Sequence, residues 1–432
     1  MKKFDKDFLL GASTAAHQVE GNNIHSDSWA LEHMKYTSFA EPSLDAVDHY
    51  NRYEEDIRLL ADAGLNCYRF SIEWARIEPA EGQFDKAEVE HYRKVIRCCK
   101  NNGVTPVVVM HHFTSPKWLI SKGGWEAQST VEDFKRYCSY LVNELGDELE
   151  YVVTINEANM GLQLAAIAKR FIRQMLLPKR KRNSDGNDGQ AQVGINLKRM
   201  LLNLKYAAAE NLELFGTEKV NNFHSMRTPE GDLLIFRAHC AARDAMKAIN
   251  PHLKVGVSLS LHDIQWKKGG EKQAAKEWDA EFVHYLPYIK NDDFLGVQNY
   301  TRNYFGRFGR IDSDRIPGAE LTQMGYEFYP EALENVIRTV AKDFKGDIIV
   351  TENGIATSDD TRRVEFIRRA VDGVQNCIAD GIPVKGYCYW SLLDNFEWQK
   401  GFSKTFGLIA VDRKTQMRYP KESLAYLGSF AK

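Results

Sequence analysis

The sequence predicts a (β/α)8 barrel that forms a single domain over residues 1–432. Short runs rich in Val, Ile, Phe and Tyr recur eight times, and stretches with helical periodicity lie between them. Strands that alternate with helices pair in parallel, because a parallel crossover needs a helix-sized connection. Several runs are apolar without alternation, as expected for a sheet covered on both faces. Eight such units favour a closed barrel over an open doubly wound sheet.

The expected elements follow one another along the whole chain. The strands are expected at Phe8–Gly11, Cys67–Ile72, Thr105–His111, Tyr151–Ile155, Lys254–Leu259, Phe294–Val297, Asp347–Thr351 and Val384–Trp390. The helices are expected at Tyr53–Ala63, Ala87–Lys100, Val131–Leu145, Leu233–Ala248, Pro330–Lys342 and Asp360–Asp380. The first strand is followed by neither GxGxxG nor GxxxxGKS, which weakens a nucleotide-binding interpretation.

The connection between the fourth and fifth strands, about residues 160–253, is roughly twice as long as the others. It contains the basic run Lys179–Arg182, followed by the polar segment Asn183–Gly189. A solvated loop is the ordinary interpretation of such a run, and a patch for an anionic substrate is the alternative. A formal net charge of −2 for the whole chain favours the solvated loop.

The composition narrows the class of partner. With 57 Lys and Arg against 59 Asp and Glu, the chain is a poor non-specific ligand for nucleic acid or an anionic membrane. Apolar runs fall short of the roughly 18 residues of a membrane helix, and charges interrupt the N-terminal segment. Seven dispersed cysteines without a CxxC motif are typical of reduced thiols. We therefore expect a cytoplasmic protein without nucleic-acid or membrane partners, and its oligomeric state, including a homo-oligomer, stays open.

Polar and aromatic side chains follow most of the predicted strands. In a (β/α)8 barrel these strand ends form one rim, which carries the active site. The rim residues are His17, Gln18, Arg69, Glu73, Trp74, His111, His112, Phe113, Asn156, Glu157, Gln298, Asn299, Tyr300, Glu352, Asn353, Trp390, Asp394, Glu397 and Trp398.

Two rim carboxylates, Glu157 and Glu352, directly follow apolar strands, where a charge is costly without a partner or a function. Either one alone is best explained as a strand-end cap or as an ion-pair partner of a residue such as Arg69. Two of them beside Asn residues in one barrel indicate a catalytic pair. Two carboxylates with aromatic platforms suit glycoside hydrolysis, in which one group is protonated and the other is ionised.

The separation of the two carboxylates decides the stereochemistry: about 5–5.5 Å gives retention and about 6.5–9.5 Å gives inversion. At about 5 Å and an effective dielectric constant of about 20, two charges repel by about 3 kcal/mol, or about two pKa units. That repulsion is enough for one Glu to act as an acid near neutral pH.

The histidines raise the question of a metal. HExxH is absent, and the adjacent His111 and His112 point to opposite faces of a strand, so we expect no metal and no cofactor. One of these two histidines can face the barrel mouth and bind a sugar hydroxyl. Trp390 and Trp398 are either core residues or stacking faces for a sugar ring.

At these residues the chain resembles glycoside hydrolase family 1, the β-glucosidase and β-galactosidase family. The matching segments run in family order over nearly the whole chain: Phe8–Gly21, Tyr68–Pro79, His112–Trp118, Thr154–Glu157, Val350–Gly354 and Tyr389–Asp412. Residues of about 165–235 match poorly. The combination is highly specific, whereas a lone Thr-Glu-Asn-Gly motif is weak.

The resemblance implies a role for each matching residue. Glu157 would be the general acid/base and Glu352 the nucleophile, with Arg69 and Tyr300 holding Glu352. Asn156 would bind the sugar 2-hydroxyl. The resemblance also implies that Gln18, His112, Glu397 and Trp398 bind the other ring hydroxyls and that Trp390 forms the stacking floor.

The chain departs from the family pattern at several positions. Ala158 stands where Pro is usual after the acid/base, Phe113 stands where Trp is usual, and Gln298-Asn299-Tyr300 replaces Asn-Tyr-Tyr. The branch that acts on 6-phosphoglycosides has a Ser where Glu397 stands and a Tyr near Phe406. Only its Lys is kept here, as Lys404, so unphosphorylated sugars are expected.

The main hypothesis is a retaining exo-β-glycosidase that hydrolyses β-D-glucosides by double displacement, with β-galactosides and β-fucosides as further substrates. A phospho-β-glycosidase and a catalytically inactive sugar-binding barrel are the alternatives. The aglycone and the balance between hydrolysis and transglycosylation stay open, because loops build the leaving-group pocket.

Overall fold

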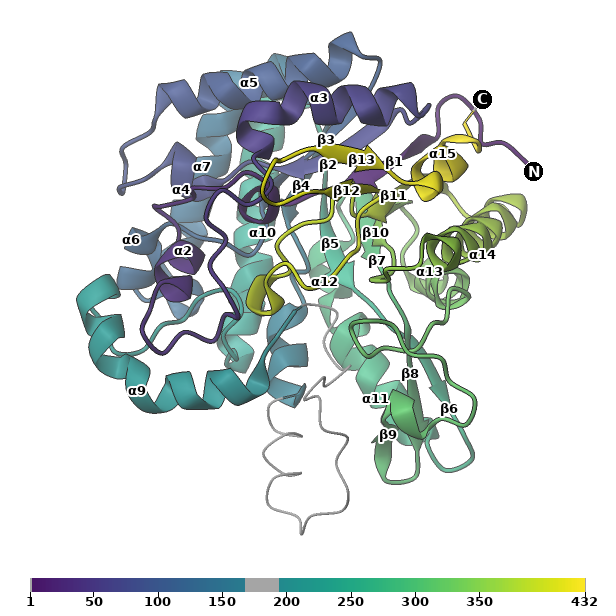
Figure 1. Ribbon diagram of the computed structural model, residues 1–432. Coiled ribbons are helices and arrows are strands. Elements are labelled where there is room, and N and C mark those ends of the chain that lie inside the picture. The colour runs from purple at the N-terminus through teal and green to yellow at the C-terminus, as the bar shows by residue number, and fades with distance from the viewer. Residues whose placement is uncertain (1, 168–193, 432) are drawn as a thin grey trace.

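The computed structural model describes residues 2–167 and 194–431, and eight parallel strands in it close into a barrel (Figure 1). The strands are β1 (Leu9–Ser13), β2 (Cys67–Ser71), β3 (Thr105–His111), β4 (Tyr151–Ile155), β5 (Lys254–Ser260), β7 (Phe294–Gln298), β10 (Asp347–Asn353) and β11 (Val384–Trp390). They follow chain order around the ring, and β11 pairs with β1 to close it. The predicted (β/α)8 fold is confirmed, with all eight strands at their expected places.

Helices connect the barrel strands and cover the outside of the barrel (Figure 1). The crossover helices are α3 (His49–Asp62), α5 (Lys86–Asn101), α7 (Thr130–Leu145), α10 (Pro229–Ile249), α11 (Glu271–Glu281), α12 (Leu286–Ile289), α13 (Ala332–Asp343) and α14 (Asp360–Ala379), and α15 (Glu422–Gly428) follows β11. The shorter helices are α1 (Ala16–Val19), α2 (Asp27–Glu32), α4 (Trp74–Ile77), α6 (Lys117–Ser121), η1 (Gly124–Glu126), η2 (Gly146–Glu148), η3 (Val283–Tyr285), η4 (Ser313–Arg315) and η5 (Trp398–Lys400). The six expected helices are all present.

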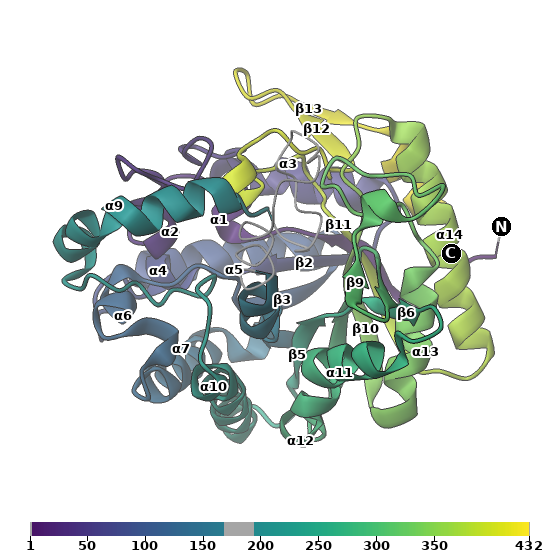
Figure 2. The ribbon, with the colours of Figure 1, turned by 90° about the horizontal axis from the view of Figure 1, so that it is seen from below.

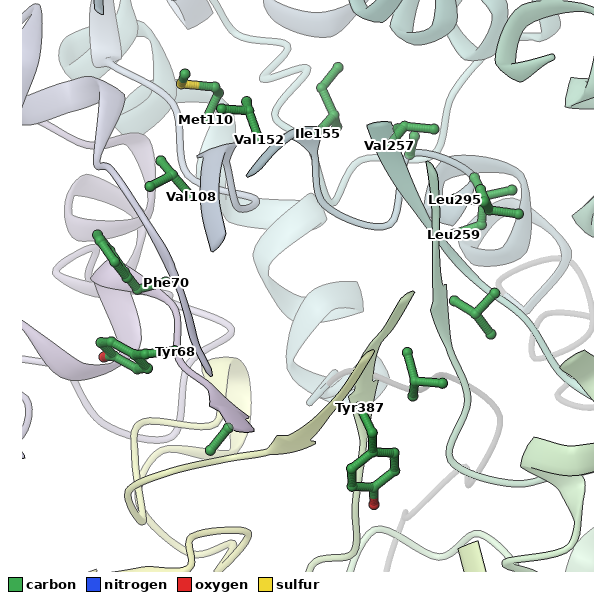
Figure 3. Close-up of a cluster of buried hydrophobic side chains, with 14 of the residues drawn as sticks. Tyr68, Phe70, Val108, Met110, Val152, Ile155, Val257, Leu259, Leu295 and Tyr387 are labelled. Atoms are coloured by element: carbon green, nitrogen blue, oxygen red, sulfur yellow. The ribbon is translucent and has the colours of Figure 1, made fainter. Parts of the chain in front are cut away.

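The barrel strands are buried on both faces, as their apolar runs predict. Leu9, Cys67, Val107, Val109, Val153, Phe294, Ile349 and Cys388 form the cluster inside the barrel. The outer faces carry the side chains labelled in Figure 3, which belong to the core shared with the helices. Successive side chains of a strand point to opposite faces. On β2 this rule turns Tyr68 and Phe70 outward and sends Arg69 into the barrel.

Helix ends on the outside follow ordinary capping chemistry. The Asp85 side chain accepts hydrogen bonds from the first backbone amides of α5, and Thr228 caps α10, which has Pro229 in its first turn. Such caps satisfy amides that have no partner within the helix. The caps fix where these helices begin, and therefore how far each connection runs before the next strand.

Additional elements stand at the carboxyl ends of the strands. The strands β6 (Asp263–Trp266), β8 (Arg302–Gly306) and β9 (Gly309–Ile311) form a small sheet, and β6 and β8 begin just after β5 and β7 end. The helix α9 (Leu197–Phe215) belongs to the long connection after β4. Figure 2 shows α9 and the small sheet on opposite sides of the barrel. The pair β12 (Ile409–Val411) and β13 (Arg418–Pro420) follows β11.

The long connection between β4 and β5 is only partly described. The basic run Lys179–Arg182 and the polar segment Asn183–Gly189 lie outside the described residues. The single-domain organisation over residues 1–432 stays a prediction. Among the helices described, none combines the length and the apolar character that crossing a membrane requires.

Candidate active site

The structure gathers most of the predicted rim residues at the carboxyl ends of the barrel strands. Arg69 lies on β2, Glu352 and Asn353 end β10, and Trp390 ends β11. Asn156 and Glu157 directly follow β4, and Tyr300 follows β7 after two residues. Asp394 differs from the other rim residues. Its carboxylate binds Lys421 at 2.8 Å and accepts from the backbone amide of Gly407. These contacts fix the loop after β11.

Glu352 is held at both of its oxygens. Nη1 of Arg69 lies 2.7 Å from Oε1, and the Tyr300 hydroxyl donates to Oε2 at 2.6 Å. Only 3% of Glu352 is exposed, and this burial raises the pKa of its carboxyl above the usual value. The Arg69 charge and the Tyr300 hydrogen bond oppose that rise in pKa, because both favour the ionised carboxylate.

Glu157 has a different environment. Its backbone adopts a φ of 45°, in the left-handed region, and its amide donates to the Ser258 hydroxyl at 3.2 Å. Oε2 of Glu157 is buried and has no hydrogen-bond partner within the described part of the chain. Burial, then repulsion by Glu352 and by Glu397, raise the pKa of Glu157 well above its usual value, with Arg69 opposing. Glu157 therefore holds its proton more firmly than Glu352 does.

Asn156 shares its partners with the two carboxylate residues, since Arg69 binds Glu352 and Ser258 accepts from the amide of Glu157. Its Oδ1 accepts hydrogen bonds from Arg69, from Nε2 of Gln298 at 2.7 Å and from Ser258 at 3.3 Å. An amide oxygen surrounded by donors fixes the orientation of the side chain. Nδ2 consequently lies 3.2 Å from Nε2 of His112. Gln298, a departure from the family pattern, thus helps to orient a residue of the site.

The two adjacent histidines point to opposite sides, as the strand geometry predicts. Nε2 of His111 lies 3.0 Å from the Ser115 hydroxyl, and its ring packs on Trp125 under the helices. His112 lies in the barrel mouth, with its ring 5.7 Å from that of Trp390. Burial lowers the pKa of His112 well below its usual value, so its imidazole is neutral.

A third buried carboxyl, Glu397, stands in the loop after β11, directly before η5. Its Oε1 accepts from the Gly194 amide at 2.9 Å, and its Oε2 lies 3.5 Å from Nε2 of Gln18. Burial raises the pKa of Glu397 to about 8. Gln18 also donates to the Phe396 carbonyl at 2.7 Å. The Lys404 ammonium is bound to the Gln323 carbonyl at 2.9 Å and interacts electrostatically with Glu397.

The two tryptophans add aromatic surface to the rim. Trp390 packs in a cluster that includes Tyr300 and Phe406. Trp398 stacks on His17 with ring centroids 5.6 Å apart and an angle of 6° between the planes. Both indoles are almost fully buried among polar rim residues, an arrangement that suits the faces of a sugar ring.

Some residues of the site were missed by sequence reasoning. Ser258 lies on β5 and contacts Asn156 and Glu157, yet a Ser inside an apolar strand gives no signal of its own. Tyr326 lies in the loop before α13, and its hydroxyl is buried without a partner among described residues. Burial, and then Glu397, Glu157 and Glu352, raise its pKa. The path of the loop that carries Tyr326 is not defined by the sequence pattern.

The arrangement can perform acid–base and nucleophilic chemistry on a substrate with several hydroxyl groups. Burial and a neighbouring carboxyl raise the pKa of one carboxyl, a second is held by a cation and a phenol, and polar side chains with aromatic faces surround them. The described residues contain no group of three or more His, Cys, Asp or Glu placed to hold a metal ion.

Comparison with known proteins yields matches over the full chain. Residues 1–182 and 290–432 match the model of Glycosyl hydrolase family 1. The crystal structure of the β-glycosidase BGL167 has a TM-score of 0.86 and 44% identity, with 99% of this chain and 96% of that chain covered.

Curated relatives are more distant in sequence. Beta-glucosidase A of Acetivibrio thermocellus is 28% identical, over 97% of this chain and 96% of the relative. A 6-phospho-beta-galactosidase of Staphylococcus haemolyticus is 27% identical, over 100% of this chain and 99% of the relative.

Proposed function

The chain belongs to glycosyl hydrolase family 1, and from this premise we propose that it is a retaining exo-β-glycosidase that acts on β-D-glucosides. In this proposal Glu352 is the nucleophile and Glu157 is the general acid/base. β-Galactosides and β-fucosides are further substrates. Free cysteines at all seven positions support a cytoplasmic location.

The first step forms a glycosyl-enzyme ester. The Glu352 carboxylate attacks the anomeric carbon while Glu157 gives its proton to the departing glycosidic oxygen. Arg69 and Tyr300 hold both oxygens of Glu352, so they favour its ionised form against the effect of burial and fix the direction of the nucleophile. The observation that carries the proposal is the geometry at the strand ends, where Arg69 and Tyr300 hold both oxygens of the buried Glu352 and the buried Glu157 follows β4 on the same rim.

The repulsion between Glu352 and Glu157 accounts for the change of role of Glu157 from acid to base. When Glu352 becomes an ester, its negative charge disappears, and the pKa of Glu157 falls because the repulsion that raised it is gone. Glu157 can then take a proton from water, which attacks the same carbon and releases the sugar with retained configuration. A sugar acceptor in place of water would give transglycosylation.

The residues around Glu397 support an unphosphorylated glycone. A Glu397 carboxyl with a pKa of about 8 is largely protonated at neutral pH, so it can both donate to and accept from a sugar hydroxyl. Gln18, His112 and Trp398 would bind the remaining hydroxyls, Asn156 the 2-hydroxyl, and Trp390 would stack under the ring.

The specific observation that favours a phosphorylated glycone is Lys404, whose ammonium lies near Glu397. Its hydrogen bond to the Gln323 carbonyl already uses one donor, and Glu397 stands where the branch that acts on 6-phosphoglycosides has a Ser. We therefore rank this alternative second.

The deciding experiment measures kcat/KM on 4-nitrophenyl β-glycosides of glucose, galactose, fucose, xylose and glucuronic acid, and on the glucoside 6-phosphate. We expect the glucoside to rank first and proton NMR of the first product to show the β-anomer. A higher kcat/KM for the 6-phosphate would support the phospho-β-glycosidase. Binding of the glucoside without turnover would support the inactive sugar-binding barrel.

A further inference from the structure

The segment that carries Glu157 leaves the regular pairing between β4 and β5 before it reaches the site. The register of the two strands extends as far as the pair Val153 and Gly256. Past this pair the chain turns, and Glu157 adopts a φ of 45°, in the left-handed region that is uncommon for a residue with a side chain. A carboxyl that must point at a leaving oxygen therefore needs other contacts to hold its backbone.

Ser258, on β5, supplies two of these contacts. Its hydroxyl accepts a hydrogen bond from the backbone amide of Glu157 at 3.2 Å, and its carbonyl accepts from the amide of Ala158 at 3.0 Å. Two successive amides of the bent segment are thereby attached to one residue of the neighbouring strand. Ser258 is fully buried, where such hydrogen bonds are electrostatically stronger than in water.

The hydrogen-bonding capacity of the Ser258 hydroxyl is fully used. A hydroxyl has one hydrogen to donate and two lone pairs that accept. Here it donates to Oδ1 of Asn156 at 3.3 Å. Its lone pairs accept from the amide of Glu157 and from Nε2 of Gln298, both at 3.2 Å. These partners fix the orientation of the hydroxyl, and so they fix the place where the amide of Glu157 is held.

Two of the departures from the family pattern meet at Ser258. The Pro that is usual at position 158 has no N–H and fixes its own φ. Ala158 lacks that rigidity but donates to the Ser258 carbonyl, and Gln298 donates to the Ser258 hydroxyl. Ser258 itself lies outside residues 1–182 and 290–432, the parts of the chain that match the family model. The family pattern therefore does not supply this arrangement, in which hydrogen bonds stand in for the rigidity of Pro.

We propose that Ser258 is a positioning residue for the general acid, which holds the backbone of Glu157 so that its carboxyl faces the leaving-group oxygen. The assignment rests on the proposed function, in which Glu157 protonates that oxygen. A displaced acid transfers its proton less well, because the transfer needs a distance of about 2.6–3.2 Å between the heavy atoms. The loss should therefore be largest for substrates whose leaving group needs the proton.

Ser258→Ala removes the hydroxyl and keeps the strand. The measured quantity is the ratio of kcat/KM on 2,4-dinitrophenyl β-glucoside to kcat/KM on phenyl β-glucoside. We expect this ratio to rise about 10-fold over wild type, because the buried amide of Glu157 loses its acceptor. The lost donor to Asn156 should slow both substrates alike, so it cancels in the ratio. A ratio within about twofold of wild type would overturn the proposal.

Ala158→Pro tests the same attachment without a change inside the barrel. Pro is the usual residue at this position in the family, and it removes only the amide that donates to the Ser258 carbonyl. The ratio of the two kcat/KM values should rise by about threefold or more. If Ser258→Ala does not fold, this variant decides in its place, and an unchanged ratio overturns the proposal.

Ser423→Ala is the matched control. The Ser423 hydroxyl is also fully buried and hydrogen-bonded, to Oδ1 of Asp360 at 2.8 Å, and it lies on α15 outside the barrel. Its loss should lower the free energy of unfolding and leave the ratio unchanged. A rise in the ratio as large as that of Ser258→Ala would show that any loss of stability raises it, and the positioning role would be overturned.

Glu157→Ala in the same assay separates this proposal from the proposed function. If Glu157→Ala raises the ratio by about 100-fold or more and Ser258→Ala leaves it unchanged, the positioning role is wrong and Glu157 remains the acid. If Glu157→Ala itself leaves the ratio unchanged, Glu157 is not the acid, and both proposals are overturned.

Discussion

The Tyr300 hydroxyl donates to Oε2 of Glu352 at 2.6 Å, at the oxygen that Arg69 leaves unbound. The two donors approach from different strands, since Arg69 lies on β2 and Tyr300 follows β7. Between them they satisfy one lone pair on each carboxylate oxygen and favour the ionised form. Tyr300 is therefore expected to tune the nucleophile, and its removal should be visible in a pH profile.

Replacing Tyr300 with Phe removes this hydrogen bond and keeps the ring. The pKa of Glu352 should rise, because the hydrogen bond stabilises its charged form. We expect kcat/KM to fall about 10- to 100-fold and the acidic limb of its pH profile to move to higher pH. The measurement is kcat/KM on an activated aryl β-glucoside between pH 4 and pH 9.

Tyr285→Phe is the matched control for this prediction. Its hydroxyl donates to a buried carboxylate too, Oδ2 of Asp232 at 2.9 Å, under the helices. The control should lower stability without moving the acidic limb. A Tyr300→Phe profile that keeps the wild-type acidic limb would contradict the tuning role.

Glu352→Ala should abolish hydrolysis and leave a space where the carboxylate stood. Azide added to this variant can attack the anomeric carbon from the same face, while Glu157 still protonates the leaving group. With an activated aryl β-glucoside as donor, azide displaces the phenolate from the opposite face in a single step, so the product should be the α-azide. Proton NMR of the product identifies the anomer, and a β-azide would show that Glu352 is not the nucleophile.

Glu157→Ala should discriminate between leaving groups. A 2,4-dinitrophenolate departs without a proton, so glycosylation of Glu352 by that substrate should stay close to the wild-type rate. An alkyl or unsubstituted phenyl glucoside needs the acid, and its kcat/KM should fall by about 100- to 10,000-fold. Azide should then give the β-azide, by attack on the glycosyl-enzyme. Equal losses for good and poor leaving groups would argue against Glu157 as the acid.

The barrel itself could be predicted because its signal is local and repeated. Each strand is a short apolar run, and each helix has its own periodicity, so errors at single boundaries do not alter the fold. β6, β8 and β9 were not predicted, because each has three to five residues and pairs with a segment that the pattern does not identify. The helix α9 was not predicted within the long connection, where Leu233–Ala248 was the helix expected.

Within the site, the strand ends could be predicted and the contacts could not. Glu157, Glu352 and Arg69 were found because a charged residue in or next to an apolar strand is unusual. Ser258 and Tyr326 are ordinary residue types in their own segments, and only the closed ring brings them to the carboxylates. The partner of Asp394 is Lys421, which no spacing rule connects with it.

Glu397 gives a prediction about stability and pH. Its pKa is raised from 4.5 to about 8 by burial, so the folded protein keeps a proton that the unfolded chain releases. A raised pKa in the folded state contributes stability that is fully present below about pH 4.5 and is lost as the pH rises toward 8. At about 1.4 kcal/mol per pKa unit, the loss attributable to this group is at most about 5 kcal/mol.

Glu397→Gln should remove that loss, because an amide resembles the protonated carboxyl and cannot ionise. We expect the free energy of unfolding, measured in urea from pH 5 to pH 8, to increase for the variant relative to wild type as the pH rises. Glu365→Gln is the control, since Arg368 lowers the pKa of Glu365 and its titration falls below the range tested. A difference in the free energy of unfolding between Glu397→Gln and wild type that stays constant from pH 5 to pH 8 would mean that Glu397 is ionised in the folded protein throughout. Glu397 could then not donate a hydrogen bond to a sugar hydroxyl.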